Sequence, residues 1–195
     1  GGLCAVEEQN IDRRVRKTKR QLRQALMMLM SEKPSKSISV RELAERADIN
    51  RGTFYIHYKD VSDLLQRLED EMAERLILVC KKYAYATTEV SAFPYLTELY
   101  RFARDNADLC QVLLGPNGDR AYTERICDIL YSYFLRDFVA RFYGGDRDRL
   151  EYFCRFIVSG NLTLTLQWLS GGMKETPEEM AQLAGGIIMD GVRAL

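Results

Sequence analysis

The chain has 195 residues, of which 47% are hydrophobic and 10% aromatic. This composition supports one compact domain or two small ones with an apolar core, and it excludes wholesale disorder. No apolar run reaches the roughly 18 residues that a membrane span needs, and no signal-peptide pattern is present. We therefore expect a cytoplasmic protein that has no membrane partner.

The formal net charge of +0 hides an uneven distribution along the chain. Residues 13–59 hold thirteen basic and four acidic side chains, a formal charge of +9 that leaves −9 for the remainder. A basic segment on an acidic remainder suggests an anionic partner at one end of the molecule. A solvated basic surface accounts for the same count, so charge alone leaves both interpretations open.

The five cysteines form no Cys-x-x-Cys pair, and the single histidine is His57. A metal site needs clustered ligands with compatible spacing, which this pattern does not offer. Four of the cysteines fall in apolar helical patterns, where a reduced thiol behaves as a small hydrophobic side chain. We therefore predict core positions for them, with no metal site and no cofactor.

The N-terminal third of the chain predicts short helices. Residues 1–12 show no apolar periodicity and indicate no element, whereas residues 17–30 repeat apolar side chains at helical spacing and predict a first helix. Pro34 ends that helix. Ser39 and Glu42 predict a capping box at the start of a second helix: the serine oxygen accepts from a first-turn N–H, and the glutamate reaches back.

A third short helix follows a polar turn at residues 48–50, in which Ile49 is the one expected buried anchor. Asn50 can cap this helix, which runs to about Tyr58. Two short helices across a three- to four-residue turn predict a helix-turn-helix at about residues 39–58. Three side chains of this segment are assigned mainly to the core: Phe54, Ile56 and Tyr58.

The rest of the chain is also predicted to be helical. Asp60 can cap a long fourth helix, whose apolar period continues to Tyr83. The last helix begins at residues 176–179, where Thr is the cap and Pro the first helical residue. No alternating strand pattern appears, so we predict an all-α fold. The remaining helices are expected at about residues 92–104, 109–114, 119–143 and 146–170.

Residues 39–65 read SVRELAERADINRGTFYIHYKDVSDLL. This segment resembles the TetR (tetracycline-repressor) family, whose signature is a capped helix, a turn and Gly-Thr-Phe-Tyr-x-His-Phe/Tyr leading into a fourth helix. The resemblance extends from Arg16 to Leu76. It implies a helix-turn-helix DNA-binding domain at residues 13–76, joined by a long helix to a helical-bundle domain at residues 77–195 that binds a ligand and dimerises.

In such a domain the third helix enters the major groove of DNA. Arg51 can contact guanine through two hydrogen bonds, and Thr53 can hydrogen-bond a base or a phosphate or touch a thymine methyl group. The resemblance implies phosphate contacts for Tyr55 and His57; the alternatives are core packing for the tyrosine and a buried or metal-bound histidine. The candidate DNA-binding residues are Ser39, Arg41, Arg51, Gly52, Thr53, Tyr55, His57 and Lys59.

Val61 departs from the family pattern, which usually has a phosphate-binding lysine at this position. That contact is lost unless Lys59 or the N-terminus of the fourth helix replaces it. Basic residues of the first helix can add backbone or minor-groove contacts: Arg13, Arg14, Arg16 and Arg20.

The resemblance also implies a homodimer, built from the last two long helices of each subunit as a four-helix bundle. Glycine inside a helix costs about 1 kcal/mol relative to alanine, so helical glycines here suggest close helix approach. Packing within one chain is the alternative. Residues 172–180 resemble a C-terminal domain type common in regulators of Firmicutes. The candidate interface residues are Phe156, Gly160, Leu164, Trp168, Leu183, Ile187 and Gly191.

Family members typically bind a small molecule among the helices of the C-terminal domain. The residues do not reveal which molecule, and core packing is the alternative for every aromatic candidate. We predict a repressor of transcription that an effector releases from operator DNA. The alternative is a module of the same fold that binds small molecules or proteins and no longer reads DNA. No phosphate loop or nucleophile–base pattern indicates an enzyme. The candidate pocket residues are Tyr100, Phe102, Tyr131, Phe134 and Phe138.

Overall fold

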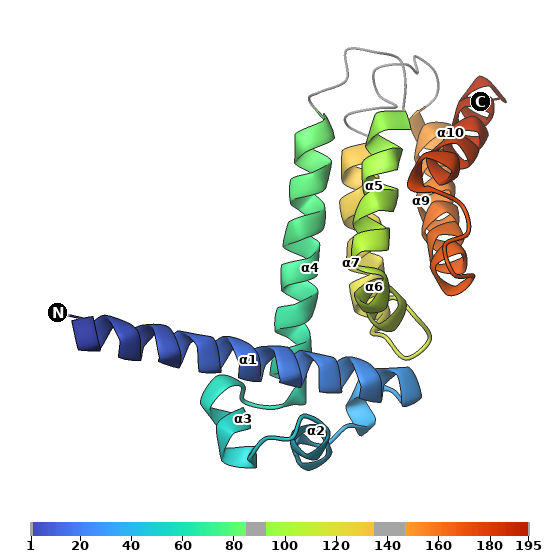
Figure 1. Cartoon of the computed structure of the whole chain (residues 1–195). Coiled ribbons are helices and arrows are strands. Elements are labelled where there is room, and N and C mark those ends of the chain that lie inside the picture. The colour runs from blue at the N-terminus through green and yellow to red at the C-terminus, as the bar shows by residue number, and fades with distance from the viewer. Residues whose placement is uncertain (1, 85–92, 135–146, 195) are drawn as a thin grey trace. The chain divides into compact units, whose positions relative to one another are not determined.

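The computed structural model describes residues 2–84, 93–134 and 147–194, and these residues contain helices and no strand (Figure 1). The predicted all-α fold is confirmed. None of the described helices is long and apolar enough to cross a membrane. The helices are α1 (Gly2–Glu32), the 3-10 turn η1 (Ser35–Ser37), α2 (Val40–Arg46), α3 (Arg51–His57), α4 (Val61–Ala84), α5 (Phe93–Asp105), α6 (Ala107–Leu113), α7 (Arg120–Phe134), α9 (Arg147–Ser170) and α10 (Pro177–Ala194).

The chain folds into two compact units, and α4 contributes residues to both of them. We call residues 1–70 with 116–118 the head, and residues 71–115 with 119–195 the body. The loop at 116–118 belongs to the head, where the Asn117 amide donates to the Met30 carbonyl at 3.0 Å.

The head is built on local capping, as predicted. The Ser39 hydroxyl accepts from the Glu42 N–H at 3.2 Å, and the Asp60 carboxylate accepts from the Asp63 N–H at 2.8 Å. The Glu42 carboxylate also binds the Lys33 ammonium at 2.6 Å. Its hydrogen bonds to Lys33 and to the Ser39 backbone lower the pKa of Glu42, in line with the predicted capping box.

Helix α1 begins at Gly2, so the prediction that residues 1–12 carry no element is wrong from residue 2 onward. Apolar periodicity reports burial, whereas residues 3–16 contain neither Gly nor Pro to interrupt a helix. The buried side of α1 lies against the core of the head and includes Leu22, Leu26 and Leu29, each 0% exposed.

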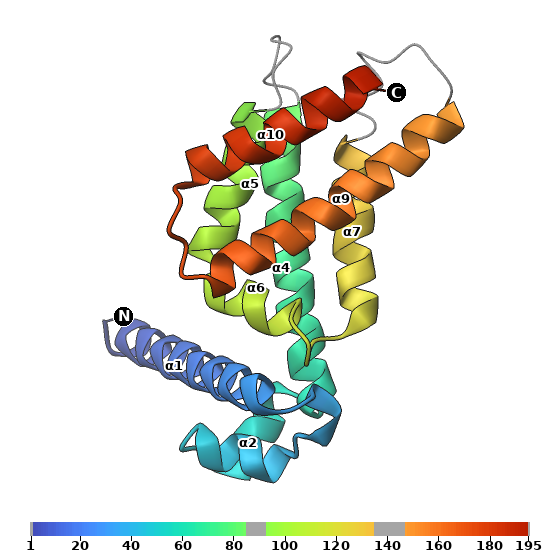
Figure 2. The ribbon, with the colours of Figure 1, turned by 90° about the vertical axis from the view of Figure 1, so that its right-hand side faces the viewer.

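The body packs α10 along α5, and α9 contacts α5, α6 and α7 (Figure 2). The predicted start of α10 is confirmed by two reciprocal bonds: the Glu179 N–H donates to the Thr176 hydroxyl at 3.2 Å, and the Thr176 N–H donates to the Glu179 carboxylate at 2.7 Å. The predicted helix at residues 119–143 is α7 as far as Phe134, and residues 135–143 lie outside the described residues.

Three of the four cysteines predicted in the core are buried: Cys80, Cys110 and Cys154. Cys127 is only half-buried, so its predicted core position is wrong. Burial raises the pKa of Cys110 to about 12 and that of Cys154 to about 11. These thiols therefore stay protonated at neutral pH and act as small apolar side chains.

Candidate functional site

Helix α3 buries one side chain in the core of the head, and its opposite face is exposed. Phe54 is 0% exposed, whereas Tyr55 is 53% and Ile56 is 76% exposed. At about 100° per residue, Gly52 and Ile56 lie almost opposite Phe54. The prediction that Ile56 belongs to the core is therefore wrong. The outward face of α3 centres on Gly52 and Ile56, one turn apart, and is flanked by Thr53 and Tyr55.

The start of α3 is fixed by Asn50, whose side-chain oxygen accepts from the Gly52 N–H at 2.8 Å. A Cβ at Gly52 would lie 3.3 Å from that oxygen and within 4 Å of nothing else outside its neighbours. Arg51 is exposed, and its guanidinium makes no hydrogen bond to the described part of the chain. Asp48 forms the preceding turn with φ of 53°, while Ile49, the predicted anchor, is only half-buried.

The end of α3 lies near a lysine that the sequence did not indicate. Burial lowers the pKa of His57, and the positive charge of Lys19 on α1 lowers it further. His57 is half-buried and Lys19 exposed. The neutral imidazole can donate one hydrogen bond to a phosphate, and the ammonium stands close by. Their proximity depends on how α1 packs against α3, which no local pattern encodes.

Val61 is 7% exposed and packs inside the head. Because its side chain is buried, this position serves the core here and presents nothing to a partner. Lys59, two residues earlier, is exposed, and its N–H donates to the Asp63 carboxylate at 3.0 Å. Lys59 therefore places an exposed cation just beyond the end of α3.

Most carboxylates of the basic segment are paired within the head. Glu42 binds Lys33 at 2.6 Å, and Glu32 binds Arg46 at 3.0 Å. Arg41 binds Glu45 at 2.9 Å, but the two side chains are 75% and 65% exposed. An ion pair this exposed is weakened by water, so a phosphate can compete for the Arg41 guanidinium. Ser39 is exposed and caps α2.

The body contains an apolar cavity of about 70 Å³. Tyr100 and Phe102, two of the candidate pocket residues, line this cavity. The Tyr100 hydroxyl donates to Asn161 at 2.6 Å, and burial raises its pKa to about 12. The other lining residues are Leu76, Leu99, Ala103, Cys110, Leu114, Ile126, Leu130, Leu162, Thr165 and Leu166.

The remaining pocket candidates are not placed at this cavity. Tyr131 does not line it; its ring centroid lies 4.5 Å from the guanidinium carbon of Arg155. Phe134 ends α7, but its side chain lies outside what is described, and Phe138 falls outside the described residues. Aromatic spacing in the sequence could not separate cavity-lining rings from surface rings.

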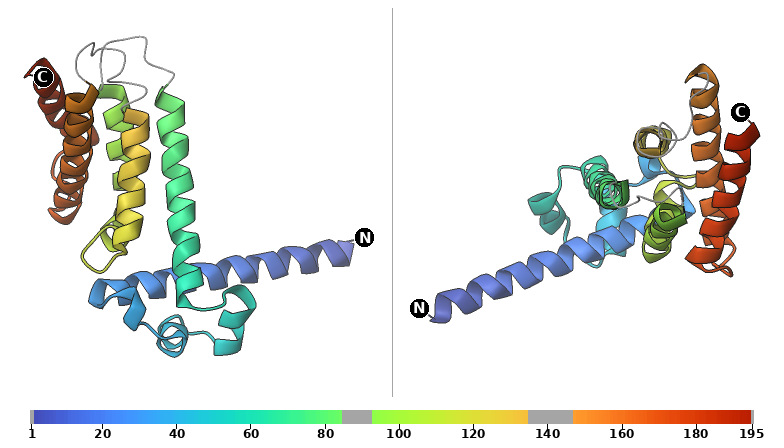
Figure 3. Two further views of the ribbon diagram at one scale, coloured as in Figure 1. Left: turned by 180° about the vertical axis from the view of Figure 1, so that it is seen from behind. Right: turned by 90° about the horizontal axis from the view of Figure 1, so that it is seen from above.

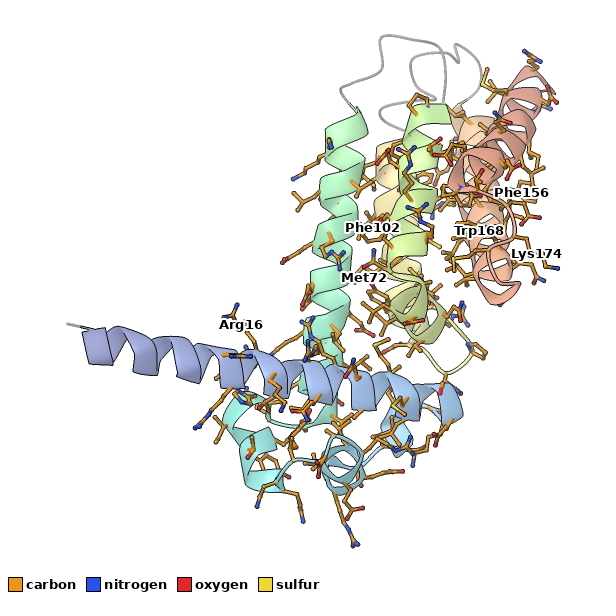
Figure 4. The ribbon with its side chains drawn as sticks, in the orientation of Figure 1. Arg16, Met72, Phe102, Phe156, Trp168 and Lys174 are labelled. Atoms are coloured by element: carbon orange, nitrogen blue, oxygen red, sulfur yellow. The ribbon has the colours of Figure 1, made fainter. Side chains whose placement is uncertain are left out.

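Large apolar side chains are exposed on α9 and α10, which lie side by side in both views of Figure 3. Phe156 is 73% exposed, and Leu183 and Ile187 are 52% and 53% exposed. Figure 4 shows Phe156 on α9. An open groove of about 240 Å³ runs here; it is lined by Phe156, Ile157, Gly160, Asn161, Leu164, Ala184, Ile187 and Ile188.

Two of the predicted interface residues pack inside their own chain. Trp168 is 5% exposed, its ring meets Tyr100 edge to face at 5.6 Å, and its N–H donates to the Glu175 carbonyl at 3.0 Å. Assigning Trp168 to a dimer interface is therefore wrong. At Gly191 a Cβ would lie 2.6 Å from the ring of Phe153, so this glycine serves contact within the chain.

Comparison with known proteins agrees with this architecture. The family model described as "Bacterial regulatory proteins, tetR family" matches residues 22–68, and that described as "Transcriptional regulator C-terminal region" matches residues 91–190. An uncharacterized HTH-type transcriptional regulator of Bacillus subtilis (strain 168), YxbF, is 32% identical over 56 residues. That match covers 29% of this chain and only 15% of the relative.

Two solved structures share the fold over nearly the whole chain. A TetR transcriptional regulator from Streptococcus agalactiae 2603V is 24% identical, with a TM-score of 0.60 over 93% of this chain and 98% of the other. The fatty acid degradation regulator FadR from Bacillus halodurans is 15% identical, with a TM-score of 0.65 over 90% and 96%. At these identities the likeness concerns the fold alone.

A helix-turn-helix that exposes its second helix, followed by a helical body, defines a DNA-binding regulator of transcription. The chain belongs to the TetR family of bacterial transcriptional regulators.

Proposed function

We propose that this regulator is a repressor that binds double-stranded operator DNA as a homodimer and that a small-molecule effector releases. The observation that carries the proposal is the outward face of α3, bare at Gly52 and bordered by exposed basic side chains. We assign DNA binding to residues 13–76, and ligand binding and dimerisation to residues 77–195. The proposal makes the chain a non-enzymatic protein of the cytoplasm, where operator DNA lies.

Each exposed side chain of the head takes a role that fits its chemistry. Arg51 reads a base edge, because a guanidinium matches the two acceptors of guanine. Tyr55 and His57 donate to phosphates, and Lys59 supplies the charge that Val61 cannot. Gly52 lets the backbone approach the DNA closely. Ser39 and Arg41, at the start of α2, contact the backbone of the duplex.

The groove on α9 and α10 supports the dimer. Exposed side chains as large as Phe156 and Ile187, gathered on one face, mark an interaction surface. A Cβ at Gly160 or Gly186 would meet nothing within 4 Å, so packing among the described residues gives no reason for either glycine. A second copy pressed against this face supplies that reason. Phe156, Gly160, Leu164, Leu183 and Ile187 are the proposed contacts.

The cavity at Tyr100 is the proposed effector site. Its volume of about 70 Å³ is well below the roughly 300–1,000 Å³ of pockets that hold drug-sized ligands. An effector must therefore widen it by displacing helices of the body. A ligand that prefers the widened state weakens DNA binding by its difference in affinity between the two states.

Fluorescence anisotropy tests the function directly. The probes are the promoter DNA beside the protein's own gene and fragments selected from the genome, each titrated at several salt concentrations. We expect saturable binding whose logarithm falls linearly with that of salt, by about 0.9 per neutralised phosphate. If the protein binds none of these DNA probes, the proposed function as a DNA-binding regulator is rejected. Deleting the gene of this protein should raise transcription from the bound promoter. If transcription falls instead, the protein is not a repressor.

A further inference from the structure

Ile56 is the most exposed large hydrophobic side chain of the described residues, at 76%. It lies on α3 almost opposite the fully buried Phe54, so the fold of the head gives it no packing role. An isoleucine in this position leaves its branched apolar side chain in water, so a partner that covers it gains the free energy of burying that side chain.

The surroundings of Ile56 point to DNA as that partner. Gly52 lies one turn before it on the same face and projects no side chain. Arg51 and Lys59 are exposed at the two ends of α3. A polyanion that approaches these basic residues brings its groove onto the outward face between them, where Ile56 is exposed.

The major groove offers one apolar group, the 5-methyl group of thymine. Guanine and adenine present acceptor or donor atoms there, and cytosine presents an amino group. Isoleucine placed over those edges removes water from polar atoms without replacing their hydrogen bonds, which costs free energy. Placed over thymine, it covers a methyl group that water solvates poorly.

We propose that Ile56 reads a thymine in each operator half-site by packing its side chain against the 5-methyl group. This inference rests on the proposed function and adds a specificity-determining residue to it. Arg51 and Ile56 then recognise different bases, the first by hydrogen bonds and the second by apolar contact.

Deoxyuracil substitution isolates the methyl group, because deoxyuracil pairs as thymine does and lacks only that group. Operator DNA selected from a random pool is remade with each thymine replaced in turn, and Kd is measured for the full chain. For the wild type we expect one thymine per half-site at which the replacement weakens binding about fourfold, the effect of burying one methyl group less. For I56A we expect no loss at that thymine and unchanged losses elsewhere.

Thr53→Ser is the matched control, since it removes the other methyl group on this face and keeps the hydroxyl. It must retain the loss seen at the thymine that Ile56 reads. Loss of the effect in T53S instead of I56A overturns the inference, as does wild-type binding that is insensitive to every replacement. Both results leave DNA binding intact, whereas binding to no DNA at all rejects the proposed function itself.

I56A must also fold as the wild type does. Ile56 makes no core contact, so we expect the same thermal unfolding midpoint for both proteins. A lower midpoint for I56A contradicts the exposed position on which the inference depends.

Discussion

In the head, the exposed face of α3 is bordered by basic side chains, and Ile56 is its one exposed large aliphatic side chain. In the body, the exposed faces of α9 and α10 carry several large apolar side chains. A charged surface stays hydrated until it meets a polyanion. An apolar surface of comparable size is costly in water and is covered by another protein surface. The proposed function accordingly gives the two regions different partners: DNA for the head and a second copy for the body.

Phe54→Ala gives the largest expected effect, because it empties the core of the head. Phe54 is 0% exposed, and truncating a buried phenylalanine costs about 3–5 kcal/mol. Urea unfolding followed by circular dichroism measures this loss. Ile56→Ala, two residues later and exposed, is the control and should change stability by less than about 0.5 kcal/mol. Equal losses for the two variants would contradict the orientation of α3.

Phe156→Arg tests the partner of the body. A charge in the middle of an apolar interface is costly to bury, so we expect a monomer in sedimentation experiments. A monomer loses the second half-site, which weakens operator binding by about 100-fold or more. Gln111→Arg adds the same charge at an exposed position of α6 and should remain dimeric. A Phe156→Arg protein that still dimerises locates the interface elsewhere.

Arg51→Ala tests whether the head reads bases with this side chain. Loss of a two-bond contact to guanine costs about 1–3 kcal/mol of discrimination against the other bases. DNA selected from a random pool should therefore no longer prefer guanine at one position of the half-site. Arg41→Ala is the matched variant, for which we expect weaker binding to all sequences alike. An unchanged preference in Arg51→Ala assigns this residue to phosphate.

His57→Gln gives the smallest expected effect, which is a change in pH dependence. Burial and Lys19 lower the pKa of His57 in the free protein, while a bound phosphate stabilises the protonated form. Binding then takes up a proton, so affinity rises as the pH falls from 7.5 towards 5.5, by about tenfold for each unit by which DNA raises the pKa. Glutamine keeps a donor but does not titrate, and this rise should disappear. An identical rise in His57→Gln excludes the phosphate contact.

Local chemistry was enough to predict the short helices α2 and α3 of the head, although not the start of α1 at Gly2. Ser39, Asn50 and Asp60 cap helices through bonds to N–H groups two or three residues away, so their role depends on nearby sequence alone. The helix-turn-helix and the family resemblance follow from the same short segment. The all-α fold could also be predicted, since helical periodicity and Gly or Pro breaks repeat along the chain.

Tertiary packing decided which face of each helix is exposed. From the sequence we assigned Ile56 to the core and Trp168 to an interface, and the structure reverses both, because burial depends on which distant helices come into contact. The pairing of Glu42 with Lys33 and the nearness of Lys19 to His57 join α1 to α2 and α3 in the same way. The cavity at Tyr100 forms where four helices of the body and part of α4 fail to fill the space between them, and no single segment of sequence contains that information.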